Sequence, residues 1–125
     1  MYVVPHACAA ILIPATFGVA GLLYGLYLPM LIAHHCGYAI NSVCHSARFG
    51  SRPYATPDGS RNVAWLALPS LGESFHNNHH FDPRCARHGT AAGQHDATAV
   101  MISLLERLGV AHRVRWHEGK AVTPR

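Results

Sequence analysis

The sequence lacks charged side chains over its first part, because no Lys, Arg, Asp or Glu precedes Arg48. The missing basic residues near the start argue against a cleaved secretory signal, which needs a positively charged first region. The stretch from Ala7 to Ala33 is nearly all apolar, and it exceeds the roughly 20 apolar residues that cross a hydrocarbon core of about 30 Å. This absence of charge therefore predicts a membrane segment.

Cysteine is also sparse. The four cysteines form no CxxC pair, and most of them lie in or near the apolar part. The spacing excludes a disulfide framework and favours reduced thiols that behave as small apolar side chains. These residues are Cys8, Cys36, Cys44 and Cys85.

Pro14, Gly18 and Gly21 interrupt the apolar run. We expect them to divide it into the end of one helix, a short turn and a second helix, which together form a partial transmembrane hairpin. The second helix is predicted to start near Val19 and to continue toward His45, with a kink at a proline that a membrane helix tolerates.

The first basic residues, Arg48, Arg52 and Arg61, crowd just after the apolar part. The positive-inside tendency then predicts a multi-pass membrane protein whose C-terminal part is cytoplasmic. We expect a transmembrane helical part over residues 1–47 and a cytosolic part over residues 48–125. The net charge of +4 suits anionic lipid headgroups or a phosphate-bearing substrate. Motifs typical of nucleic-acid binding do not occur.

The stretch GESFHNNHH brings His76, His79 and His80 within five positions. In a helix, positions i, i+3 and i+4 share one face, so the three imidazoles can converge. Neutral imidazole is a common metal ligand and suits iron, zinc or copper. The alternative is an accidental cluster, because the chain has eleven histidines. The pair His34 and His35 is a candidate for such an accident.

Asn41 and His45 form a second candidate site, because a spacing of four puts them on one helical face. Their alternative role is structural, with Asn41 bonding a neighbouring helix. Ser70 and Glu73 have the spacing of a capping box and predict that the histidine helix starts at Ser70. Glu73 is three residues before His76, so it either caps the helix or orients a ligand imidazole from outside the metal site.

The tail predicts an amphipathic helix that Asp96 caps and Gly109 ends. We expect its apolar stripe to pack against the rest of the protein; the stripe comprises Val100, Met101, Leu104, Leu105 and Leu108. The following VAHRVRWHEG alternates as a short strand or extended edge does. The stretch RCARHG, with Arg84, Arg87 and His88, is interpreted as a solvated face, with contact to acidic headgroups or a carrier phosphate as the alternative.

Three motifs together, INSVCH, GSRPYATPDGSRN and GESFHNNHH, resemble the C-terminal half of the membrane-bound fatty acyl desaturases, particularly the delta-9 acyl-CoA type and its bacterial relatives. The resemblance implies an oxidoreductase of fatty acid biosynthesis, in which histidines from three boxes hold two irons on the cytosolic side of four membrane helices. It also implies O2, a saturated fatty acyl substrate and a ferredoxin or cytochrome b5 type electron donor. By position, His45, His76, His79 and His80 would bind iron, and Asn41 would contact iron through water.

The family's two earlier histidine boxes are absent from this sequence. Four histidines cannot hold two irons in the family manner, so the resemblance predicts an all-α membrane protein that is a C-terminal fragment and is inactive alone. A truncated product, a misplaced start and one half of a split enzyme all fit. The alternatives are an inert or single-metal membrane remnant, a related histidine-box hydroxylase or ketolase, and a zinc hydrolase that uses three histidines.

Overall fold

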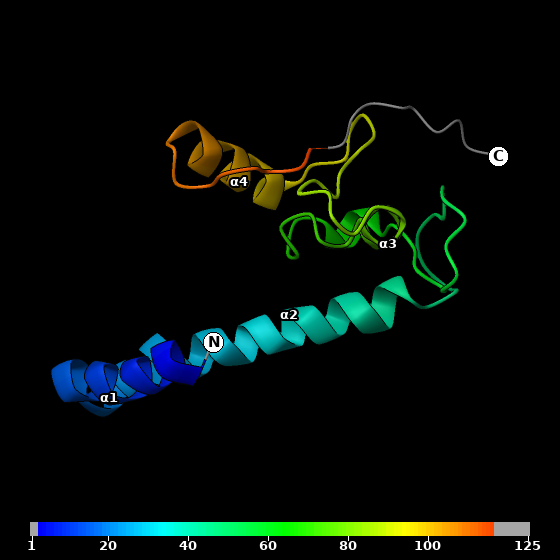
Figure 1. Cartoon of the computed structure of the whole chain (residues 1–125). Helices are drawn as coiled ribbons and strands as arrows, with labels where there is room; N and C mark the ends of the chain where they lie inside the picture. Colours follow the sequence, from blue (N-terminus) through cyan, green and yellow to red (C-terminus); the bar gives the residue numbers. More distant parts are fainter. Residues whose placement is uncertain (1–2, 117–125) are drawn as a thin grey trace. The chain divides into compact units, whose positions relative to one another are not determined.

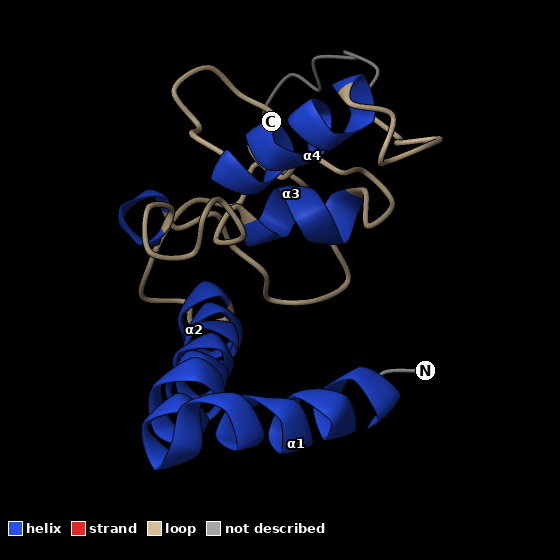
Figure 2. Cartoon of the chain, turned by 90° about the vertical axis from the view of Figure 1, so that its left-hand side faces the viewer, coloured by secondary structure: helices blue, strands red, loops and turns tan. Residues whose placement is uncertain are grey.

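A computed structural model describes residues 3–116. The described residues contain helices and loops but no named strand, as Figure 2 shows, which confirms the all-α prediction. The elements are α1 (Val3–Ala20), η1 (Gly21–Tyr27), α2 (Leu28–Cys44), η2 (Ala64–Leu66), α3 (His76–Phe81) and α4 (Ala97–Arg107). They form two compact units, divided between Gly37 and Tyr38 within α2.

The first unit doubles back at Gly18, at one of the predicted interruptions. Gly18 has φ 62° and ψ −155°, a conformation that glycine adopts without steric strain. A Cβ on Gly25 would lie 3.3 Å from Cγ2 of Ile13. Residues twelve apart in one straight helix are about 18 Å apart along the axis, so this approach requires a reversal. Figure 1 shows α1, in blue, folded back at this end of the chain.

Between the reversal and α2, the helix widens into the π-helical segment η1. The N–H of Leu28 bonds to the carbonyl of Leu23, five residues earlier. Pro29 has no N–H for the carbonyl of Gly25, and a wider turn just before a proline accommodates that loss. The π-helical segment thus directly precedes the proline at which a kink is predicted.

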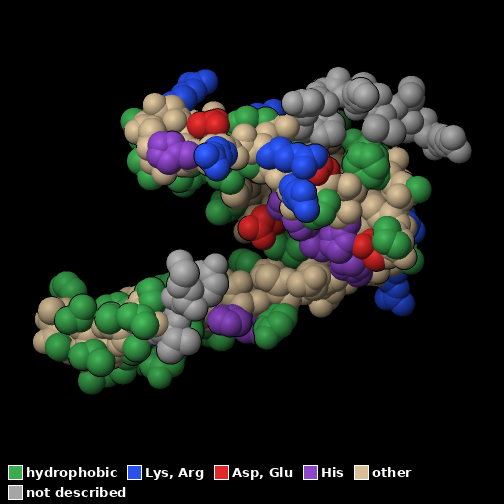
Figure 3. Space-filling view, in the orientation of Figure 1, with side chains coloured by type: hydrophobic (Ala, Val, Ile, Leu, Met, Phe, Trp, Pro, Cys, Tyr) green, Lys and Arg blue, Asp and Glu red, His purple; other side chains and the backbone are tan. Residues whose placement is uncertain are grey.

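The helical run Val4–Cys44 is long and apolar enough to cross a membrane. None of its most apolar stretch is buried, unlike the core helix of a soluble protein. Phe17 and Val19 are each 72% exposed, and the space-filling view in Figure 3 shows hydrophobic side chains as green atoms over this segment. Apolar side chains on this scale need a non-aqueous environment or a partner.

The second unit has a small core at the end of α2. Cys44 and Val63 are fully buried and pack with Ile40 and Leu66. Two hydrogen bonds join Val63 of this core to Ser74, which lies shortly before α3. The Val63 N–H donates to the Ser74 carbonyl (2.9 Å), and the Ser74 hydroxyl donates to the Val63 carbonyl (2.9 Å). The chain between α2 and α3 is therefore held both by this apolar core and by hydrogen bonds.

Helix α4 has the predicted ends but not the predicted packing. Asp96 accepts a hydrogen bond from the Ala99 N–H (2.8 Å) as the N-cap, and Gly109 has φ 70° beyond the last turn. The apolar stripe is largely exposed, with Val100 at 69% and Leu108 at 66%. The expectation that it packs is wrong for the described chain, because helical spacing reveals an apolar face but not whether a neighbour covers it.

Residues 110–116 form no strand, contrary to the prediction from their alternation. Arg113 has φ 56°, which interrupts an extended backbone, and the carbonyl of Arg115 accepts one bond from the Ala86 N–H (2.8 Å). The remaining residues of the predicted strand, 117–119, lie outside the described part of the chain.

Candidate metal centre

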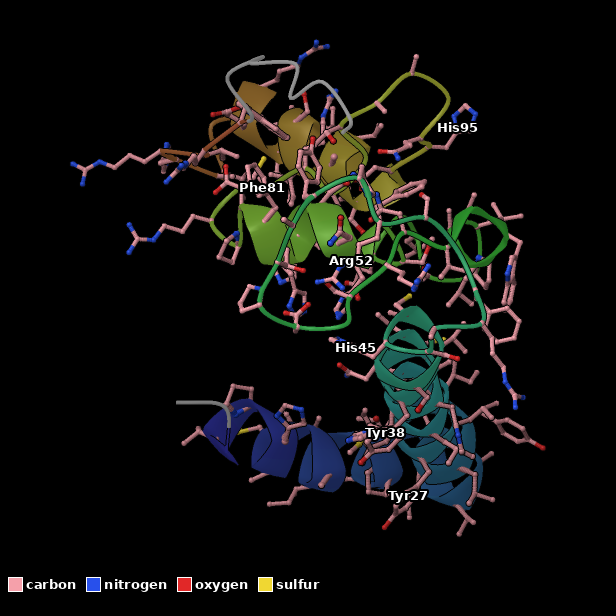
Figure 4. The ribbon with its side chains drawn as sticks, turned by 90° about the vertical axis from the view of Figure 1, so that its right-hand side faces the viewer. Tyr27, Tyr38, His45, Arg52, Phe81 and His95 are labelled. Carbon is pink, nitrogen blue, oxygen red and sulfur yellow. The ribbon has the colours of Figure 1, made fainter. Side chains whose placement is uncertain are left out.

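Three predicted ligands converge in the second unit. His45 directly follows α2, whereas His76 and His80 begin and nearly end α3. Their potential ligand atoms all lie within 4.8 Å of one another, and Nε2 of His76 is 3.0 Å from Nε2 of His80. Figure 4 labels His45 at the end of α2, and Figure 3 shows a cluster of purple histidine side chains in this unit.

The donor atoms fit a transition metal. Two nitrogens that each bind one ion at about 2.0–2.1 Å lie roughly 3 Å apart when they are neighbouring ligands, which agrees with the spacing of the two Nε2 atoms. Burial, with the nearby His80, His45, His79 and His88, lowers the pKa of His76 to about 4. The imidazole of His76 is therefore neutral at neutral pH, which is the form that binds a metal.

His79 lies beside this group but makes a different contact. Its ring centroid is 4.5 Å from that of His88, and its Nδ1 atom is buried with no hydrogen-bond partner among residues 3–116. Burial lowers the pKa of both rings; neighbouring histidines add to the effect at His79, and Asp96 opposes it at His88. This unpartnered buried nitrogen of His79 is a further potential metal ligand, beside the group of His45, His76 and His80. The interpretation of His88 as part of a solvated face is wrong, because its ring is half-buried against His79.

Asn41 and Glu73 have known positions in the second unit, and their predicted roles stay predictions. Asn41 is an exposed residue in the last turns of α2, and its carbonyl accepts the His45 N–H at 3.3 Å. Glu73 is exposed, and its charge raises the pKa of His79 against the larger lowering by burial. Among residues 3–116, no hydrogen bond joins Glu73 to a histidine side chain.

Helix α3 begins at His76 and not at Ser70. The Ser70 hydroxyl donates to the Leu66 carbonyl (2.7 Å) and accepts the Ser74 N–H (3.1 Å), which stabilises the preceding turn. The free N–H groups of α3 are instead satisfied by Asn62, whose Oδ1 accepts from the backbone of Asn77 (2.9 Å) and Asn78 (3.1 Å). The capping-box prediction is wrong because the cap comes from a residue distant in sequence.

The two asparagines between the histidines form the buried side of α3. Asn78 donates to the His88 carbonyl (2.6 Å) and to Oε1 of Gln94 (2.9 Å), and it accepts from Nδ2 of Asn62 (2.5 Å). Asn77 is fully buried. Since i+1 and i+2 point away from i and i+4 on a helix, the asparagines hold the helix while the histidines face the site.

Asp58 is a site residue that the sequence analysis did not identify. Its Oδ2 contacts Nδ1 of His80, although the two residues are 22 positions apart. Hydrogen bonds from Ser60, the Asp58–His80 contact and the Thr56 hydroxyl hold the pKa of the Asp58 carboxyl below its usual range, against the effect of burial. In the sequence, Asp58 precedes Gly59 and is typical of a turn, so no local signal marks it as a neighbour of the histidines.

The fold and the site together define a class: a helical protein with a long apolar segment and a polyhistidine cluster suited to a metal. No protein-family model matches the chain. Sequence similarity to known proteins indicates its relatives. The chain is 45% identical to the Delta-9 desaturase-like 4 protein of Arabidopsis thaliana over 86 residues, which are 69% of this chain and 28% of the relative.

Two further relatives agree. The chain is 41% identical to Delta-9 acyl-lipid desaturase 1 of Arabidopsis thaliana over 98 residues, 78% of this chain and 32% of the relative. It is 35% identical to the sn-1 stearoyl-lipid 9-desaturase of Anabaena variabilis over 99 residues, 79% of this chain and 36% of the relative. The chain is thus a relative of the delta-9 fatty acyl desaturases, and it spans about a third of the length of these curated proteins.

Proposed function

We propose that this chain is the C-terminal part of an O2-dependent diiron fatty acyl desaturase, which introduces a double bond into a saturated acyl chain. The observation that carries the proposal is the convergence of His45 with His76 and His80 in a chain related to delta-9 desaturases. The substrate would be an acyl-CoA or a lipid-linked acyl chain, as the names of several relatives state for those proteins.

In this proposal, the imidazoles of His45, His76, His79 and His80 each provide one nitrogen ligand for iron, and Asn41 contacts iron through water. Iron bound there would supply the O2 chemistry that removes two hydrogens from an acyl chain, with two electrons from a ferredoxin or cytochrome b5 type donor. The nitrogens that converge belong to the end of α2 and to α3, so they can hold one metal position. His79 lies outside this group of three, with its ring 4.5 Å from that of His88, and would hold a second position.

The apolar part of the chain would hold the site at the membrane. The apolar run Val4–Cys44 would anchor the chain in a multi-pass membrane domain among lipids, with the histidine unit on the cytoplasmic side. An acyl chain is soluble in the hydrocarbon core of the membrane. Because His45 directly follows the apolar helix α2 in the chain, the metal-binding histidines would lie near the membrane surface and close to such a substrate.

We propose that the chain is inactive alone, because four histidines are too few for two irons. The second candidate function is a single-metal protein, which the mutual approach of three imidazoles within this chain favours. Related histidine-box hydroxylases share these motifs and differ in product. Iron loading tests both proposals at once: the isolated chain should bind at most one ferrous ion tightly, and two coupled irons per chain would contradict them.

The decisive experiment supplies the missing part. Membranes that contain this chain, an N-terminal desaturase half with its histidine boxes and an electron donor should convert saturated to monounsaturated acyl chains, measured by gas chromatography. Replacing His76 or His80 with Ala should abolish conversion, because an iron loses a ligand. Asn41→Ala should reduce it partly, since water can replace a water-mediated contact.

His34→Ala is the matched control. His34 is an exposed histidine of α2 whose Nδ1 atom is 2.8 Å from the Met30 carbonyl of its own helix, so its loss should leave activity intact. A hydroxylated product would indicate the related hydroxylase class. Full activity in both His76→Ala and His80→Ala would refute the ligand assignment.

A further inference from the structure

The contact between Asp58 and His80 is not an isolated surface ion pair, because Asp58 lies in a loop, Thr56 to Ser60, that several hydrogen bonds hold. One carboxylate oxygen of Asp58 accepts the backbone N–H of Ser60 (2.8 Å) and the hydroxyl of Thr56 (3.1 Å). The other oxygen contacts Nδ1 of His80. Both oxygens therefore have fixed partners, and the carboxylate cannot turn freely in its loop.

The loop is in turn tied to the histidine helix by Asn77. The Asn77 side chain accepts the Tyr54 N–H (2.8 Å) and donates to the Tyr54 carbonyl (3.1 Å). Its Nδ2 atom also donates to the hydroxyls of Thr56 (3.2 Å) and Ser60 (3.3 Å). These are the same two residues that hold the Asp58 carboxylate, so α3 fixes the loop that contacts its own histidine.

The side chain of Arg52 also holds this loop. The Arg52 guanidinium donates to the carbonyl of Thr56 (2.6 Å) and to the carbonyl of Asp58. Arg52 is exposed, yet both of its partners are backbone carbonyls of the loop. The loop therefore has fixed contacts at both ends of the segment from Thr56 to Ser60.

We propose that Asp58 is a positioning residue that fixes the imidazole of His80 with Nε2 directed at the metal position. A carboxylate at Nδ1 keeps the proton on that nitrogen and leaves the lone pair on Nε2. Nε2 of His80 is the atom that lies 3.0 Å from Nε2 of His76, so the free lone pair is directed into the cluster. The inference rests on the proposed metal site and adds the residue that sets the tautomer and orientation of one ligand.

A plain surface ion pair is the competing explanation, because the side chains of Asp58 and His80 are 32% and 28% exposed. The ion pair of Arg115 with Asp82, 3.5 Å apart and with side chains 57% and 23% exposed, is of this kind; such partly exposed pairs contribute little and fix no geometry. Asp82 therefore offers a matched control: the same residue type, in one ion pair, without contact to a histidine of the cluster.

The test uses the full chain in detergent micelles, with ¹⁵N-labelled histidine and Co²⁺ as the probe metal. In the metal-free protein, the nitrogen shifts of His80 should show a proton on Nδ1. Asp58→Ala should shift this signature toward the mixed tautomers of a free imidazole and weaken Co²⁺ binding about 10–100-fold. Asp58→Asn should lie between, because an amide oxygen can accept the same proton without the charge. Asp82→Asn should change neither measurement.

The outcomes separate the two proposals. A wild-type chain that binds no Co²⁺ contradicts the metal site, while its His80 tautomer still tests Asp58. A wild-type His80 protonated on Nε2 overturns the positioning role, and so does an Asp58→Ala variant that is folded by circular dichroism and binds Co²⁺ as tightly as the wild type. The tautomer measurement needs no variant, so a variant that does not fold leaves the test intact.

Discussion

The two units of this chain are built by opposite means. In the first unit, the backbone approaches itself closely at glycines and the apolar side chains point outward. In the second unit, buried polar side chains hold the loops; these are Ser60, Asn62, Ser70, Ser74, Asn77 and Asn78. The comparison shows that a membrane-type helical segment needs few specific side-chain bonds, whereas a site made from loops and one short helix depends on a connected polar network.

Removing a polar side chain should therefore have a large effect in the second unit. Asn77→Ala deletes an amide that is fully buried and bonded to Tyr54, Thr56 and Ser60. Leaving those groups unpaired should lower the free energy of unfolding by about 3 kcal/mol. Near-UV circular dichroism during denaturation in detergent measures the loss, and hydrogen exchange at the Tyr54 amide should become faster.

Thr16→Ala is the corresponding change in the first unit. The Thr16 hydroxyl donates to the carbonyls of Leu12 (2.8 Å) and Ile13 (3.2 Å), which belong to its own helix. Such back-bonding stabilises a helix little or not at all, so the change should be within about 0.5 kcal/mol of zero. An equal loss in both variants would contradict the difference between the units.

The parts that the sequence predicted are those set by local spacing. Hydropathy located the apolar segment, Gly18 marked its interruption, and Asp96 and Gly109 marked the ends of α4, because each signal acts within a few residues. The spacing of His76 and His80 likewise predicted their shared face. His45 was paired with them only through the resemblance, and the structure places the three together.

The contacts that the sequence did not predict are long-range. Asp58 reaches His80 over 22 positions, and Asn62 caps α3 from 15 positions away. No periodicity relates such residues, and a Ser-x-x-Glu pattern closer to the helix predicted a different cap. The exposure of the α4 stripe was not predicted for a related reason: spacing defines an apolar face, while its burial depends on what packs against it.

An effect smaller than that of Asn77→Ala is expected at Asp96, which joins α4 to the segment that carries His88. Its Oδ1 caps the helix at the Ala99 N–H, and its Oδ2 accepts the N–H groups of His88 (2.6 Å) and Gly89 (3.0 Å). Asp96→Ala should destabilise the second unit by about 2 kcal/mol, more than the roughly 1 kcal/mol of a cap alone. Thermal denaturation measures this. Asp82→Ala is the control, with an expected change below about 0.5 kcal/mol, and equal losses would show that the contacts to His88 and Gly89 add nothing.

Alanine substitutions at two glycines test the close approach within the first unit. Gly25 and Gly37 both lie in helical backbone of the apolar run, but a new Cβ at Gly25 would meet Ile13 at 3.3 Å, while one at Gly37 would meet nothing within 4 Å. Alanine is favoured over glycine in a helix by up to about 1 kcal/mol, so Gly37→Ala should raise the thermal midpoint in detergent micelles. At Gly25 the same gain is offset because Ile13 must move, and Gly25→Ala should be neutral or slightly destabilising. Combining Gly25→Ala with Ile13→Ala removes the clash and should recover part of the gain. If Gly25→Ala stabilises the chain as much as Gly37→Ala does, α1 does not pack against the π-helical segment, and the first unit is not held by close backbone packing.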